Sequence, residues 1–146
     1  MSELDDLYQE IILDHYRKPR NFGMLEGFNR AAHGDNPLCG DRLALHVKLN
    51  GDRIEDLRFK GAGCAISVAS ASMMTDALKG KSKADADALF ERFHRMVTGE
   101  SPVNDMGKLS AFAGVSEFPV RVKCATLAWH TLRAALEGMK DPVSTE

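Results

Sequence analysis

The clearest pattern of apolar and polar positions predicts a strand in the middle of the chain. Apolar side chains occupy every second position there: Leu43, Leu45, Val47 and Leu49. Such alternation is typical of a half-buried strand, and Asn50-Gly51 marks a hairpin turn after it. A two-residue turn would put Leu57 and Phe59 on the wrong face. We therefore expect a three-residue loop, residues 50–52, which sets Leu57 opposite Leu45 and Phe59 opposite Leu43.

Helical periodicity marks the two ends of the chain. A first helix is expected from a cap at Ser2 to a stop at Pro19. A last helix is expected from Pro119 through residue 137, with Gly138 as its stop. Between the first helix and the central strand, residues 28–33 are a weak candidate for a short edge strand.

Three further helices are expected between the hairpin and the last helix. The small-residue run 65–77 predicts a closely packed helix that Gly80 ends. Ser82 then begins a helix that ends at Gly99, and residues 106–113 suggest a short one that ends at Gly114. Residues 99–104 are expected to form a loop.

Composition limits the class of protein. The 146 residues are enough for one domain, 1–146, and the 19 basic and 21 acidic residues give a net charge of −2. No dense basic stripe is present, so nucleic acid is a poor candidate for the partner. No segment reaches the roughly 20 apolar residues of a membrane span. The acidic N-terminus differs from a secretory signal, and we expect a cytoplasmic protein.

The three cysteines are the residues with the most chemistry to offer. Their odd number argues against a disulfide framework, so each is a core residue, a metal ligand or a nucleophile. Cys39 and Asp41 stand two positions apart in a turn-forming segment, 36–41, where both can reach one small object. With Cys64 and Cys124 they make four donors, the number that a tetrahedral zinc site holds.

These residues taken singly also have simpler interpretations. Cys-x-Asp alone is a weak signal, Cys64 can be a small buried apolar residue, and Cys124 on a helix is more often part of a core. The spacings match no familiar zinc finger. Four histidines are interpreted as surface or internally paired residues: His33, His46, His94 and His130. His15 falls at the end of the first helix, where a positive charge is favourable.

Three motifs in order resemble those of the IscU/NifU-N superfamily, and within it the SufU branch. They are Asn-Pro-Leu-Cys-Gly-Asp at 36–41, Gly-Ala-Gly-Cys-Ala-Ile-Ser at 61–67, and Phe-Pro-Val-Arg-Val-Lys-Cys-Ala-Thr-Leu at 118–127. Residues 7–21 are also similar to the opening helix of the family. The resemblance implies an α+β fold, in which a small three-stranded antiparallel sheet packs against five or six helices.

Two positions depart from the IscU type and favour the SufU branch. Scaffolds of the IscU type carry His directly before the third Cys, where this chain has Lys123, and Lys three residues before that Cys, where it has Arg121. The chain also carries extra length around residues 81–115, as SufU proteins do. Loss of the His removes a cluster ligand.

The resemblance implies a zinc-dependent sulfurtransferase for iron-sulfur cluster assembly. Its zinc ligands are expected to be Cys39, Asp41, Cys64 and Cys124. Cys39 would accept sulfur from a PLP-dependent cysteine desulfurase of the SufS type, for which the protein would be co-substrate and activator. A His of the desulfurase would replace the Cys39 thiolate on zinc, with Arg121 assisting at the interface. Downstream cluster-assembly proteins are the other expected partners.

Two other functions stay open. In one, the same ligands build a transient iron-sulfur cluster and the protein is an assembly scaffold. In the other, the chain is a structural zinc module that only docks other proteins.

Overall fold

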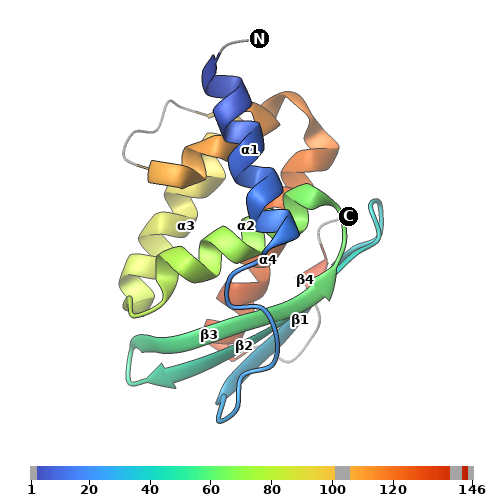
Figure 1. Cartoon of the computed structure of the whole chain (residues 1–146). Helices are drawn as coiled ribbons and strands as arrows, with labels where there is room; N and C mark the ends of the chain where they lie inside the picture. Colours follow the sequence, from blue (N-terminus) through green and yellow to red (C-terminus); the bar gives the residue numbers. More distant parts are fainter. Residues whose placement is uncertain (1–2, 101–105, 139–142, 145–146) are drawn as a thin grey trace.

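Three antiparallel strands form most of the sheet in the computed structural model, which describes residues 3–100, 106–138 and 143–144. They are β1 (Arg30–Asn36), β2 (Asp41–Asn50) and β3 (Arg53–Ala62). A two-residue strand, β4 (Val143–Ser144), pairs in parallel with β1 and gives the order β3-β2-β1-β4 (Figure 1). The predicted α+β fold is confirmed, but the sheet is mixed and has four strands, because the end of the chain adds a strand at the β1 edge.

The register predicted for the central hairpin is wrong by two residues. Leu45 pairs with Phe59 and Val47 with Leu57, and the register shifts between Lys48 and Leu49. This irregularity lets Ile54, which is fully buried, lie opposite Leu49. Because the error is an even number of residues, Leu57 and Phe59 still face the core as expected.

Five helical segments are described in the ranges above. They are α1 (Glu3–Arg17), α2 (Ala65–Leu78), α3 (Lys83–Thr98), the 3₁₀ helix η1 (Gly107–Glu117) and α4 (Pro119–Glu137). The expected ends of α3 are confirmed, since Ser82 Oγ accepts a hydrogen bond from the Asp85 amide and Gly99 is left-handed. The short helix expected to end at Gly114 instead continues to Glu117. The expected Ser2 cap and most of the 99–104 loop lie outside the described residues.

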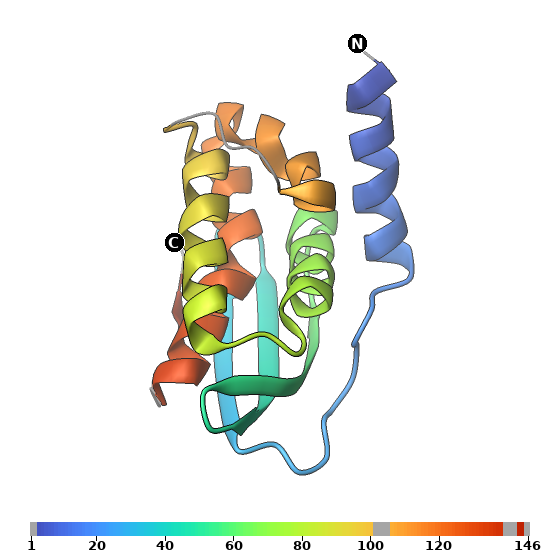
Figure 2. The same cartoon turned by 90° about the vertical axis from the view of Figure 1, so that its left-hand side faces the viewer.

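The helices gather on one face of the sheet (Figure 2). α4 packs on β1 and β2, α2 packs on β3, and α1 lies against α2 and η1. Trp129 of α4 is buried, stacks on Phe93 and donates from Nε1 to Ser70 Oγ of α2 at 3.1 Å. This contact fixes α2 against α4, so the N-terminal ends of both helices meet the β1–β2 turn. None of the described helices combines the length and apolar character needed to cross a membrane.

Candidate metal and thiol site

The β1–β2 turn presents a cysteine at the end of the sheet. The Cys39 amide donates to the Asn36 carbonyl at 3.2 Å, and Gly40 is left-handed with φ 72°. These features close a tight turn, residues 37–40, within the segment predicted to form a turn. Cys39 is half-buried on the turn, whereas Asp41 is fully buried as the first residue of β2.

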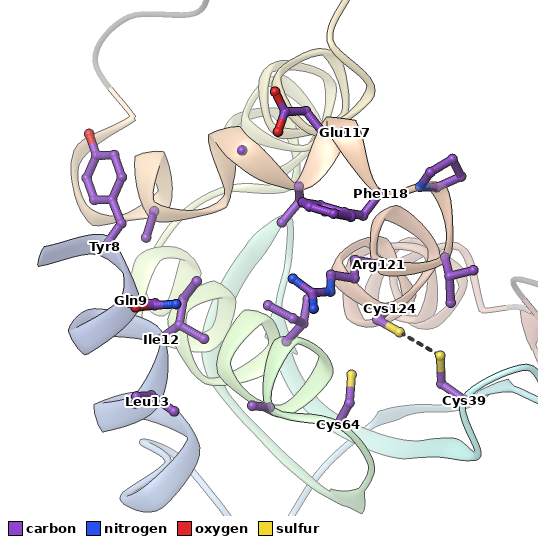
Figure 3. A pocket seen from close by; sticks show the side chains of 17 residues that line it. Tyr8, Gln9, Ile12, Leu13, Cys39, Cys64, Glu117, Phe118, Arg121 and Cys124 are labelled. Atoms are coloured by element: carbon purple, nitrogen blue, oxygen red, sulfur yellow. Dashed lines mark hydrogen bonds between the residues drawn. The ribbon is translucent and has the colours of Figure 1, made fainter. Parts of the chain in front are cut away.

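Helix α4 brings the third cysteine of the chain against this turn. Cys124 is buried on α4, and its Sγ lies 3.3 Å from Cys39 Sγ (Figure 3). Donor atoms of Cys39, Asp41 and Cys124 all lie within 4.8 Å of one another. Two thiols and a carboxylate from two distant parts of the chain, residues 39–41 and helix α4, therefore share one small volume.

Cys64 stands at the edge of this group. It is the N-cap of α2, its amide donates to Asp41 Oδ1 at 2.8 Å, and its Sγ lies 4.0 Å from Asp41 Oδ2. The closeness depends on Gly63, because a Cβ there would collide with the Asp41 carboxylate. Cys64 is half-buried and is not one of the three residues whose donor atoms mutually lie within 4.8 Å.

The surroundings of Cys124 disfavour its thiolate in the absence of a cation. Burial raises the pKa of the Cys124 thiol, and hydrogen bonds with Asp41, Cys39 and Cys64 raise it further. A divalent ion would supply the missing positive charge. Three sulfurs and one carboxylate oxygen are also the donor types that zinc takes in proteins, so these residues fit a zinc ion.

A largely apolar pocket of about 940 Å³ opens beside the thiols. Its walls come from α1, the start of α2, the end of η1 and the start of α4, and all three cysteines line it (Figure 3). Arg121 also lines it, with its guanidinium carbon 4.7 Å from the centre of the exposed Phe118 ring. Arg121 therefore sets a positive charge close to the sulfurs.

Two residues of the site were not singled out in the sequence. Gly63 makes the Asp41–Cys64 approach possible, and the repeated glycines of the 61–67 motif were a signal for it. Asn36 is fully buried beside the sulfurs, yet its place in a turn motif suggested only a turn residue. Among the described residues, no histidine joins the group formed by Cys39, Asp41 and Cys124.

The fold and this group of donors define a known class of domain. A family model described as the NifU-like N-terminal domain matches residues 7–141, and the chain belongs to that family. A Streptococcus pyogenes serotype M1 relative named iron-sulfur cluster assembly scaffold protein IscU is 47% identical over 139 residues, which cover 94% of this chain and 87% of the relative. A Bacillus subtilis (strain 168) relative named zinc-dependent sulfurtransferase SufU is 47% identical over 133 residues, which cover 90% of each chain.

Solved structures agree on the fold. A crystal structure from Fervidobacterium islandicum AW-1, described as a putative iron-sulfur cluster assembly scaffold protein for the SUF system, matches with a TM-score of 0.82 and 35% identity. The matched region covers 87% of this chain and 94% of the Fervidobacterium chain. Because relatives with both names are equally similar to the chain, similarity alone does not single out the SufU branch.

Proposed function

We propose that this protein is a zinc-dependent sulfurtransferase of the SufU branch that serves iron-sulfur cluster assembly. The proposed zinc ligands are Cys39, Asp41, Cys64 and Cys124. The observation that carries the proposal is the meeting of a half-buried thiol on a turn with a buried thiol 3.3 Å away and a buried carboxylate, at the mouth of an apolar pocket.

Unequal anchoring of the three thiols supports a transfer role for Cys39. Cys124 is buried near the N-terminal end of the packed helix α4, and Cys64 caps α2 and is tied to Asp41 through its amide. Cys39 instead lies on a turn, where a small backbone change can move its sulfur away from the others. When bound, zinc would hold the thiols as thiolates at neutral pH.

The proposed reaction is an exchange at sulfur. The Cys39 thiolate attacks the outer sulfur of a persulfide on the desulfurase, a new S–S bond forms at Cys39, and the bond to the desulfurase cysteine breaks with release of its thiolate. The resemblance implies that, with zinc bound, a His of the desulfurase would take the place of Cys39 and free its thiolate. Arg121 lines the pocket near the sulfurs, where its charge can assist an anionic persulfide.

A desulfurase of the SufS type is the proposed partner. Phe118 and Val120 at the pocket rim are about half exposed, at 48% and 49%, and offer apolar surface next to the thiols. Docking there would cover the sulfurs and keep water from the transferred atom.

The test measures cysteine turnover by a desulfurase with and without this protein. The parent should raise turnover and carry one extra sulfur on Cys39, detected by mass spectrometry after peptide mapping. Cys39→Ala should abolish both effects, whereas Asp52→Ala, in the turn at the other end of β2, should leave both unchanged. If Cys39→Ala stimulates as well as the parent, the transfer role is wrong.

The second candidate is an assembly scaffold, which the Streptococcus pyogenes relative of that name favours at 47% identity. Lys123 weighs against it, because scaffolds of the IscU type carry His at that position. Anaerobic reconstitution of zinc-free protein with iron and sulfide separates the two candidates. A stable visible chromophore that passes to an apo-acceptor protein would favour the scaffold.

A further inference from the structure

Asn36 is a buried polar residue that contacts three of the four proposed zinc ligands. It ends β1, pairs with Asp41 across the hairpin and is fully shielded from solvent. Its carbonyl accepts from the Cys39 amide at 3.2 Å. Its side-chain Nδ2 lies 3.4 Å from Cys124 Sγ and 3.5 Å from Asp41 Oδ2.

We propose that Asn36 is a positioning residue that holds Asp41 and Cys124 in place for the metal through its side-chain amide. This inference rests on the proposed zinc site and adds a residue that supports it from outside the ligand set. Residues that hydrogen-bond to ligands orient them, and their loss commonly weakens metal binding.

The chemistry of the neighbours determines which end of the amide faces the site. A carboxylate and a thiolate are both acceptors, so only the NH₂ group can face them favourably. Three thiolates and a carboxylate would also carry more negative charge than a divalent ion neutralises. The two N–H groups of Asn36, with the Cys64 amide on Asp41, offset part of that excess.

The amide oxygen of Asn36 supports this view of the residue. Oδ1 is buried and has no hydrogen-bond partner among the described residues. An unpaired buried acceptor is costly. The side chain is therefore oriented so that Nδ2 can donate to Cys124 and Asp41, although Oδ1 is left without a donor.

The same contacts distinguish the ligands from one another. Asn36 donates from its side chain to Cys124 and Asp41, whereas it reaches Cys39 only through the backbone. Cys124 and Asp41 are thus held when the Cys39 sulfur moves. Asn36 would keep the remaining ligands in place during transfer.

The first test compares zinc affinity in two matched Asn→Asp variants. Asn36→Asp keeps the side-chain shape but replaces the donor NH₂ with an acceptor, and should weaken zinc binding about tenfold to a hundredfold in competition with a chromophoric chelator. Asn29→Asp is the control. Asn29 also bridges the hairpin, donating to the Leu49 carbonyl and accepting from its amide, but at the end of β2 away from the site. Its zinc affinity should stay within about twofold of the parent.

A second measurement needs no variant and therefore does not depend on folding of a mutant. In cadmium-substituted, ¹⁵N-labelled parent protein, nuclear magnetic resonance should detect coupling between the metal nucleus and a side-chain amide proton of Asn36, carried through Cys124 Sγ. A purely structural Asn36 would give no such coupling.

The outcomes separate this inference from the proposed function. If the parent binds zinc but Asn36→Asp binds it as tightly, or if Asn29→Asp weakens binding equally, the role of Asn36 is overturned and the zinc site stands. Absence of the coupling in a cadmium-loaded parent also overturns it. If the parent binds no zinc, both proposals fail.

Discussion

Two buried polar clusters of this protein differ in how their donors and acceptors are matched. The first cluster, called the seam below, joins α1 and the residues just after it to α2. The Ser72 hydroxyl of α2 lies 2.7 Å from His15 Nδ1 and accepts from the Arg20 amide at 2.8 Å. Beside it, the Asn21 side chain donates to Thr75 Oγ1. In the site around Asp41, two sulfurs lie in contact and a carboxylate faces a third. A side-chain amide, that of Asn36, donates to Asp41 and Cys124 there.

This difference distinguishes a structural cluster from a candidate site. The polar side chains of the seam find hydrogen-bond partners within the protein. The site has an excess of acceptors and thiols, with Cys124 protonated at neutral pH as long as no cation is present, because burial and its neighbours raise its pKa. A bound divalent cation would balance this excess of acceptors and thiols.

The largest expected effect comes from removing charge at the site. Asp41→Asn should weaken zinc binding more than about a hundredfold, since changes outside the ligand set already cost tenfold to a hundredfold. The free energy of unfolding of the metal-free protein should change by less than about 1 kcal/mol, because Asn can still accept from the Cys64 amide while a buried charge is lost.

Asp52→Asn, in the opposite hairpin turn, is the matched control for zinc affinity. Chelator competition and urea unfolding of both variants give the two quantities. Unchanged zinc affinity in Asp41→Asn would remove Asp41 from the ligand set.

In the seam, a substitution should lower stability and leave zinc affinity unchanged. Ser72→Ala removes the hydroxyl that His15 and the Arg20 amide share, so the free energy of unfolding should fall by about 1–3 kcal/mol. Zinc affinity should stay at the parental value. Ser116→Ala, whose hydroxyl makes only a long 3.5 Å contact, should cost less than about 0.5 kcal/mol. Zinc loss in Ser72→Ala would mean that the two clusters are coupled.

The smallest effect is a pH dependence of stability from the seam. Burial, and then the nearby Arg20 charge, lowers the pKa of His15 below its ordinary value of 6.5. The unfolded chain therefore takes up a proton at higher pH than the folded one does. The free energy of unfolding should fall as pH drops through 6.5 toward the folded pKa of His15, and rise again with pH.

Urea unfolding of zinc-free protein between about pH 7.5 and about pH 5.5 measures this slope. Burial also lowers the pKa of His46 and of His130, so His15→Gln should reduce the slope without removing it. An unchanged slope in His15→Gln would exclude His15 as a contributor. The positive charge expected for His15 at a helix end is not favoured, because burial and then the nearby Arg20 charge lower its pKa.

Local sequence signals predicted the elements whose ends are chemically marked. Ser82 and Gly99 bound α3, and Pro119 and Gly138 bound α4, because capping and glycine conformation act over a few residues. The strand register failed because it depends on Ile54, whose burial opposite Leu49 needs an irregularity that no local pattern reveals. β4 was not predicted, because two residues are too few to show a periodic pattern.

The residues of the candidate site could be named from the sequence, but their geometry could not. Cys39, Asp41, Cys64 and Cys124 stood out by residue type and by the motifs around them. Their approach depends on α2 and α4 packing against the sheet, which spacing along the chain does not encode. The role of Asn36 was hidden because burial, not residue type, distinguishes it from an ordinary turn asparagine.

The missing side chain at Gly63 has a consequence for protein engineering. Transplanting the sulfur and oxygen donors onto another framework would not reproduce this centre unless the recipient also left room where a helix start touches the neighbouring strand. A design that copied only the cysteines and the aspartate would therefore omit a residue that the geometry requires, the glycine at position 63.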